Sequence, residues 1–163
     1  MKYPTPRATY SYAFLLCCAL IGLALYFQAV FHLELCPLCI LQRFIFLILA
    51  LLFMVGALHT QTRKVRRQYS GVILSVASLG LAVAGRHVWL ERVPAIPGAP
   101  SCGADIMYMF NTLPFKDFFR VLLSGTGECT QETWQFLHLT LPEWAMVYYG
   151  FFALIALWQI YRK

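Results

Sequence analysis

Four long apolar stretches constrain the fold of this chain more than any other feature. They cover about residues 11–31, 40–58, 70–90 and 144–161. Each is close to the roughly 20 residues that an α-helix needs to cross the hydrocarbon core of a bilayer. Of the 163 residues, 60% are hydrophobic and only 12% are charged, so little sequence remains for a separate soluble domain. The sequence therefore predicts one all-α membrane domain, residues 1–163, folded as a bundle of four transmembrane helices.

The charged residues predict how this bundle is oriented. Eight Lys and Arg residues lie before the first stretch, between the second and third, and after the fourth: Lys2, Arg7, Arg63, Lys64, Arg66, Arg67, Arg162 and Lys163. The positive-inside rule places these three segments, and with them both termini, in the cytoplasm. All seven acidic residues fall in the other two segments, about 32–39 and 91–143, which we expect on the outer side. Nucleic-acid binding by the basic 63–67 cluster is disfavoured, because its loop is short and the charge already serves topology.

Four of the six cysteines lie in the outward segments, where an oxidising compartment allows disulfides to persist: Cys36, Cys39, Cys102 and Cys129. The first two form the motif Cys36-Pro37-Leu38-Cys39, directly before the second apolar stretch. A helix N-terminus favours thiolate at such a pair, and Arg43 adds a cation one helical turn further on. The adjacent Cys17 and Cys18 lie in the middle of the first stretch, and we expect both to be packing residues.

The long outward segment, 91–143, contains one periodic stretch. In 115–123, apolar residues recur at helical spacing while the charged residues fall on the opposite face. We expect a short amphipathic helix lying in the membrane interface; a helix that caps a small soluble subdomain is the alternative. Cys102 and Cys129 flank this stretch and are able to pair across it.

Two dithiols on one side of a membrane indicate a redox relay. Thiol–disulfide exchange would carry electrons from an outside thiol, through Cys102 and Cys129, to Cys36 and Cys39. A lipid-soluble quinone is then the natural final acceptor. Arg43 and His87 both lie roughly 5–6 Å below the outer surface by helical rise. Arg43 would stabilise thiolate and reduced quinone, and His87 would bind a quinone oxygen or pass a proton, since ionisable residues within a membrane usually have functions.

Simpler roles remain open for the same residues. Cys102 and Cys129 would form a static staple in many secreted loops, and the spacing of the four outward cysteines is poor for a zinc site. Arg43 would otherwise only extend to the interface. In the redox interpretation, Glu91, one helical turn beyond His87, would orient the ring of that histidine. The aromatic residues at the start of the fourth stretch are typical of an interfacial belt and of packing: Trp144, Tyr148 and Tyr149.

Together these residues resemble the bacterial disulfide bond formation protein B (DsbB) family over nearly the whole chain. The resemblance rests on residues 35–43 (LCPLCILQR), residues 85–90 (GRHVWL), the cysteines at 102 and 129, and the lead into the fourth stretch with Trp134 and 142–144 (PEW). It implies an inner-membrane enzyme that reoxidises a periplasmic thioredoxin-fold oxidase of the DsbA type and reduces ubiquinone or menaquinone.

The resemblance also implies a role for each site residue. Cys102 would form the mixed disulfide with the partner, and the released Cys129 would attack Cys36. Cys39 would then face the quinone as a thiolate, stabilised by Arg43, while His87 would line the ring site.

Other classes are distinguishable by their cysteines. A paralogue dedicated to one partner would share the chemistry, whereas a disulfide-stapled scaffold would not need Arg43. An enzyme like vitamin K epoxide reductase would carry its Cys-x-x-Cys on a late helix, and an importer of reductant would need cysteines facing the cytoplasm.

Overall fold

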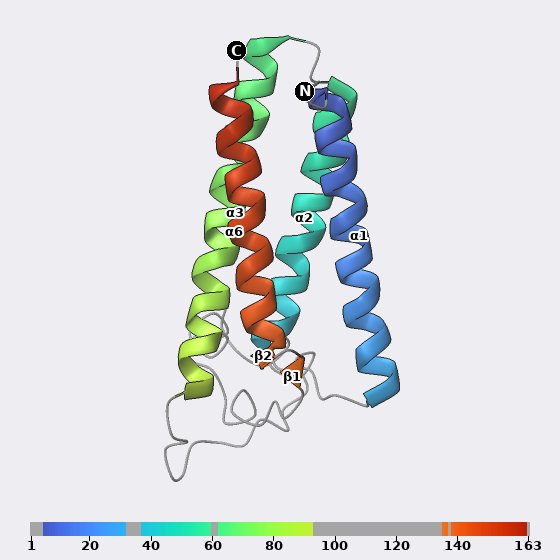
Figure 1. Cartoon of the computed structure of the whole chain (residues 1–163), viewed down its shortest axis with the longest axis vertical. Helices are drawn as coiled ribbons and strands as arrows, with labels where there is room; N and C mark the ends of the chain where they lie inside the picture. The colour runs from blue at the N-terminus through green and yellow to red at the C-terminus, as the bar shows by residue number, and fades with distance from the viewer. Residues whose placement is uncertain (1–4, 32–36, 60–61, 93–134, 137, 163) are drawn as a thin grey trace, which may run out of the picture.

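Four long helices form the body of the protein, as expected from the sequence (Figure 1). All four are long and apolar enough to cross a membrane. The computed structural model describes residues 5–31, 37–59, 62–92, 135–136 and 138–162. The helices are α1 (Pro6–Phe31), α2 (Pro37–His59), α3 (Arg63–Arg92) and α6 (Leu141–Tyr161), and a two-stranded hairpin of β1 (Gln135–Phe136) and β2 (Leu139–Thr140) precedes α6. The prediction of a four-helix membrane bundle is confirmed.

Two helices begin earlier than the apolar stretches indicate. Helix α1 starts at Pro6 rather than near residue 11, and α3 starts at Arg63 rather than near residue 70. The basic 63–67 cluster is therefore the first turn of a helix and not part of a loop, because charged residues continue a helix beyond the bilayer core without penalty. The predicted amphipathic helix at 115–123 lies outside the described residues and stays a prediction.

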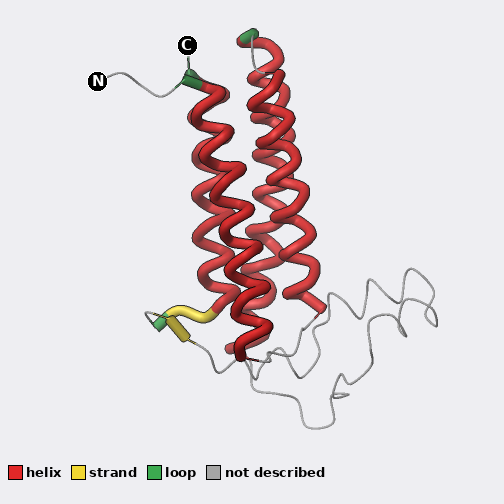
Figure 2. The backbone as a smooth tube through the Cα atoms, turned by 90° about the vertical axis from the view of Figure 1, so that its right-hand side faces the viewer, coloured by secondary structure: helices red, strands yellow, loops and turns green. Residues whose placement is uncertain are grey.

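The helices form an arc in the order α1, α2, α3, α6. The most extensive contacts join α3 to α6, followed by α1 to α2 and α2 to α3. Among the described elements, α1 packs extensively against α2 alone. The helices run alongside one another, and the hairpin lies beyond the end of the bundle where α6 begins (Figure 2). The start of α1 and the end of α6 lie at the opposite end (Figure 1).

The α3–α6 contact depends on a close approach at Gly80. This residue is buried and faces the ring of Tyr149, and a Cβ at position 80 would come within 3.0 Å of three ring atoms. Small residues at membrane helix interfaces permit such approach, and van der Waals packing there replaces the hydrophobic effect that lipid cannot supply. Gly80 thereby sets the position of the Tyr149 ring.

A column of buried aromatic rings fills the interior. Tyr149 stacks on Phe46 with centroids 4.3 Å apart and planes within 15°. Phe152 meets Phe46 edge-on at 6.3 Å and Phe53 at 5.3 Å. Phe53 in turn lies 6.0 Å from Tyr10, whose hydroxyl is 2.6 Å from Ser70 Oγ. Since these rings come from α1, α2 and α6, the column joins three of the four helices through one core.

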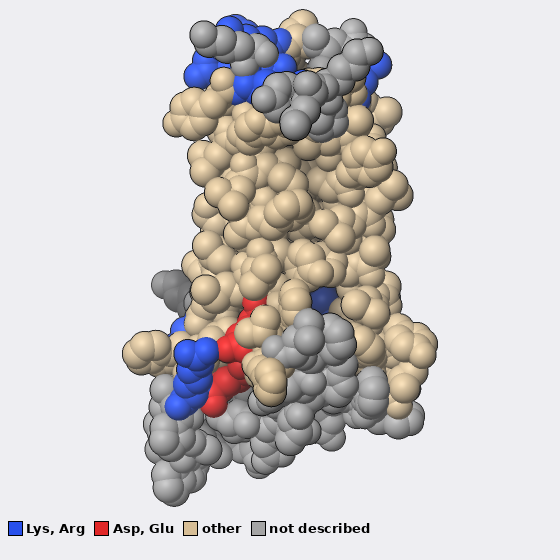
Figure 3. All heavy atoms as spheres, in the orientation of Figure 1, with Lys and Arg blue, Asp and Glu red and all other residues tan. Residues whose placement is uncertain are grey.

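The surface carries its charge at the two ends of the bundle. Figure 3 shows an uncharged band around the middle of the visible face and Lys and Arg gathered at the end where α1 begins and α6 ends. Exposed large apolar side chains such as Leu15, Leu79 and Leu154 cover the outside of the helices. That distribution suits a protein surrounded by lipid, with its charged ends in the interfaces.

Candidate functional site

Cys39 is the third residue of α2 and is half-buried. The backbone N–H groups of this first turn point toward the start of the helix and give it a partial positive charge, which favours a thiolate there. The preceding Leu38 is fully buried and fixes this turn in the bundle. The other three cysteines of the predicted relay, Cys36, Cys102 and Cys129, lie outside the described residues, so both disulfide pairings stay predictions.

Arg43 lies one helical turn deeper than Cys39 and reaches across to α1. Its Nη1 donates to Gln28 Oε1 at 2.5 Å, and its Nη2 donates to the Ala24 carbonyl at 3.3 Å. The guanidinium is half-buried. Two acceptors on one neighbouring helix hold the cation in place below the cysteine turn, so it does not extend freely to the interface.

His87 is fully buried and faces α2. Its Nδ1 lies 3.3 Å from Gln42 Nε2, and the Tyr149 hydroxyl donates to the Gln42 carbonyl at 2.8 Å. Gln42 and Arg43 are consecutive residues, about 100° apart around the helix. The same turn of α2 therefore contacts α3 and α6 through Gln42 and α1 through Arg43.

A set of polar contacts links the C-terminal end of α3 to the start of α6. Thr140 Oγ1 donates to Glu91 Oε2 at 2.9 Å, while the Thr140 backbone N–H donates to Glu143 Oε2 at 2.9 Å and so caps α6. Arg92 forms a salt bridge of 2.7 Å with Glu143. Glu91, expected to orient the His87 ring, accepts a hydrogen bond from Thr140, the N-cap residue of α6.

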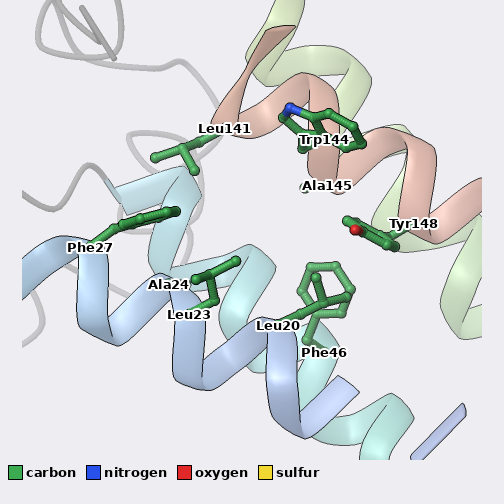
Figure 4. Close-up of a pocket in the computed structure, with 9 residues that line it drawn as sticks. All are labelled: Leu20, Leu23, Ala24, Phe27, Phe46, Leu141, Trp144, Ala145 and Tyr148. Atoms are coloured by element: carbon green, nitrogen blue, oxygen red, sulfur yellow. The ribbon is translucent and has the colours of Figure 1, made fainter. Parts of the chain in front are cut away.

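An apolar groove lies between α1 and α6, with Phe46 of α2 behind it (Figure 4). It has a volume of about 400 Å³ and is partly open. Figure 4 shows Phe27 and Ala24 on the α1 side facing Trp144 and Tyr148 on the α6 side. The full lining is Leu20, Leu23, Ala24, Phe27, Phe46, Leu141, Trp144, Ala145 and Tyr148.

The groove and the Arg43 site share a residue. Ala24 lines the groove with its side chain, and its carbonyl accepts the hydrogen bond from Arg43. Arg43 is not itself a lining residue, but its guanidinium is bonded to the backbone of one, from the helix that begins with the cysteine turn. Such a combination of an apolar cavity with a few fixed polar groups is typical of small-molecule sites.

The sequence interpretation missed three parts of this site. Gln42 received no role, although a polar amide within a membrane span already indicates function or a specific partner. Trp144 and Tyr148 were interpreted as interfacial belt and packing residues, but they line the groove. Nothing in the sequence separates a belt aromatic from a groove aromatic, because both lie near the end of a span.

The two cysteines of the first span occupy different environments. Cys17 is fully buried in the core, as a packing residue should be, whereas Cys18 is exposed on the outside of α1. Neither lies near the start of α2, since they belong to the middle of α1.

The second helix of this membrane bundle has a cysteine in its first turn and a fixed cation one turn further on. An imidazole of the third helix packs against the same turn. These are features of a membrane thiol–disulfide oxidoreductase. Comparison with known families agrees. The model of the family "Disulfide bond formation protein DsbB" matches residues 6–159. The chain belongs to the DsbB family.

Individual relatives extend over nearly the full length of the chain. Disulfide bond formation protein B of Methylococcus capsulatus is 39% identical, covering 99% of this chain and 100% of its own. The protein of the same name from Stutzerimonas stutzeri is 37% identical, covering 100% and 99%. Disulfide bond formation protein B 1 of Pseudomonas aeruginosa is 39% identical, covering 93% and 94%. The protein is thus a multi-pass membrane oxidoreductase that forms disulfide bonds.

Proposed function

We propose that this protein oxidises a periplasmic thioredoxin-fold oxidase of the DsbA type and passes the electrons to a membrane quinone, either ubiquinone or menaquinone. The observation that carries the proposal is the junction of the apolar groove with the guanidinium of Arg43 at Ala24. This junction lies one helical turn from Cys39, where the electrons of a dithiol would leave the protein.

The groove suits a quinone in size and in chemistry. Its volume of about 400 Å³ falls in the range of roughly 300–1,000 Å³ found for small-molecule pockets. Its walls are aliphatic and aromatic, as an isoprenoid tail requires, and Arg43 would face the oxygen-bearing ring. When bound, a quinone supplies an acceptor for two electrons and two protons.

The chain's own residues prepare this transfer. The N-terminal turn of α2 would hold Cys39 as a thiolate. Arg43, held by Gln28 and Ala24, would place a fixed positive charge beside negative charge that develops at the site. His87 faces the same turn of α2 from α3 and would contribute a hydrogen bond there.

Disulfide exchange would deliver the electrons to this turn. A partner thiolate attacks Cys102 and breaks its bond to Cys129, and the released Cys129 thiolate attacks Cys36 and breaks the Cys36–Cys39 bond. The second partner thiol then releases Cys102, which displaces Cys36 from Cys129. Each cycle oxidises one partner dithiol and leaves two electrons and two protons on Cys36 and Cys39.

The charge distribution supports an orientation for this relay. Arg7 and Arg66 lie near the starts of α1 and α3, and Arg162 follows the end of α6, so all three belong to the end of the bundle opposite the start of α2. The positive-inside rule assigns that end to the cytoplasm of a bacterial inner membrane and the Cys39 end to the periplasm. The partner and the oxidising compartment would then lie on the same side as the cysteines.

The decisive experiment is quinone reduction by the purified protein with a reduced DsbA-type oxidase as donor. Wild type should consume one quinone for each partner disulfide formed, and Cys39→Ser should abolish the reaction. Cys18→Ser is the matched control, because Cys18 is exposed on the outside of α1 and its loss should leave the rate unchanged. Full activity of Cys39→Ser would contradict the proposal, and an inactive wild type supplied with quinone and lipid would exclude quinone as the acceptor.

A further inference from the structure

Gln42 and His87 form a polar pair in an apolar interior. Gln42 is 6% exposed and His87 is fully buried, and they come from α2 and α3. Their nitrogens are 3.3 Å apart. A polar group without a partner in a membrane interior costs several kcal/mol, about as much as it would in a dry protein core. The pair therefore satisfies two groups that neither lipid nor the aromatic core could satisfy.

The chemistry of this contact selects one form of the histidine. The amide nitrogen of Gln42 only donates hydrogen bonds, so Nδ1 of His87 must accept. A neutral imidazole has one N–H group, and if Nδ1 accepts, the proton lies on Nε2. With the Gln42 amide nitrogen facing the ring, the contact favours the Nε2–H tautomer and orients the ring.

Gln42 is itself held from a third helix. The Tyr149 hydroxyl donates to its backbone carbonyl at 2.8 Å. The Tyr149 ring is fixed in turn between Phe46, on which it stacks, and Gly80, which it approaches closely. The backbone of Gln42 is therefore anchored to α6 while its side chain points to α3.

We propose that Gln42 is a positioning residue for the redox reaction: it holds His87 as the Nε2–H tautomer, so that the ring acts as a hydrogen-bond donor of fixed direction beside the cysteine turn. This inference rests on the proposed quinone chemistry for its purpose, but not for its geometry. Arg43 supplies the positive charge. Gln42, its neighbour on α2, orients His87, which supplies the directed N–H.

The proton position is measurable without activity. In protein labelled with ¹⁵N-histidine, protonated and unprotonated ring nitrogens give separate NMR signals. The chain has four histidines, and the His87 signals are those missing from His87→Ala. Wild type should show the proton on Nε2. Gln42→Glu, whose ionised carboxylate accepts a hydrogen bond, should place a proton on Nδ1, either instead of the Nε2 proton or in addition to it, and Gln42→Leu should leave a mixture.

Kinetics separates positioning from a merely structural role. With the DsbA-type donor, Gln42→Leu should lower kcat/KM for quinone about 5- to 10-fold, the effect of one lost hydrogen bond. Gln159→Leu is the matched control. Gln159 is also a fully buried glutamine, but it lies near the C-terminal end of α6, at the opposite end of the bundle from Gln42. This variant should change neither the His87 signals nor the kinetics.

Two results would overturn the inference. One is a wild-type His87 with its proton on Nδ1, or ring signals that neither Gln42→Glu nor Gln42→Leu changes. The other is an altered tautomer in Gln42→Leu with unchanged kcat/KM, which would limit Gln42 to a structural role. If wild type reduces no quinone at all, the proposed function fails, while the NMR result still decides the geometry.

Discussion

Replacing Gly80 with alanine tests the close packing of α3 against α6. The new methyl group would lie within 3.0 Å of three atoms of the Tyr149 ring, whereas carbon atoms in contact normally lie about 3.5–4.0 Å apart. The ring must therefore shift by about 1 Å to restore that separation. Its neighbours resist, because the ring stacks on Phe46 and its hydroxyl is bonded to Gln42.

The expected loss of stability follows from three terms. Overpacking in a well-packed interior costs about 1–3 kcal/mol. Weakening the Tyr149–Gln42 hydrogen bond adds about 0.6–1.7 kcal/mol, the range measured between membrane helices. Replacing glycine with alanine in a helix returns up to about 1 kcal/mol. Together these terms lower the free energy of unfolding of Gly80→Ala by about 1–5 kcal/mol.

The assay is reversible unfolding in mixed micelles, with Gly85→Ala as the control. Gly85 lies on the same helix and has no atom within 4 Å of the position of its added Cβ. That variant should be as stable as wild type or up to about 1 kcal/mol more stable. Equal free energies for Gly80→Ala and Gly85→Ala would show that the close approach does not constrain the bundle, and would refute the reasoning.

Two further predictions concern the groove and the buried hydroxyl pair. Ala24→Leu should raise KM for quinone about tenfold, because a larger side chain in a filled cavity costs about 1–3 kcal/mol. Ala19→Leu, on the exposed side of α1, is the control and should leave KM unchanged. Equal KM values in the two variants would exclude the groove as the quinone site. Tyr10→Phe removes the hydroxyl bonded to Ser70 and should lower the free energy of unfolding by about 0.6–1.7 kcal/mol. Combining it with Ser70→Ala should add little, and fully additive losses would show that the two hydroxyls do not stabilise each other.

The sequence predicted those parts of the fold that the bilayer dictates. A membrane span needs about 20 apolar residues, so the four helices could be located from composition alone. Their ends could not, because the basic residues from Arg63 onward form helix beyond the bilayer and hydropathy marks only the bilayer. Arg43 and His87 were identifiable because an ionisable residue in a span is rare enough to indicate a function.

What the sequence could not predict is which side chains meet. Gln42 and His87 are 45 residues apart, and their contact depends on the rotation of two helices about their axes. The groove depends on which pair of helices stays apart, and its aromatic residues resemble those of any membrane interface. Such features follow from packing angles, which a single sequence does not encode in a readable pattern.

The position of the groove between α1 and α6 affects how the apparent potencies of compounds that bind in it should be compared. These two helices have no extensive contact with each other, so a compound dissolved in lipid can reach the groove between them. Its occupancy then follows its concentration in the bilayer or micelle. Adding lipid or detergent at a fixed total amount of compound would dilute it and weaken its apparent potency, with no change in any protein contact. Potencies for this site are therefore comparable only at equal ratios of compound to lipid.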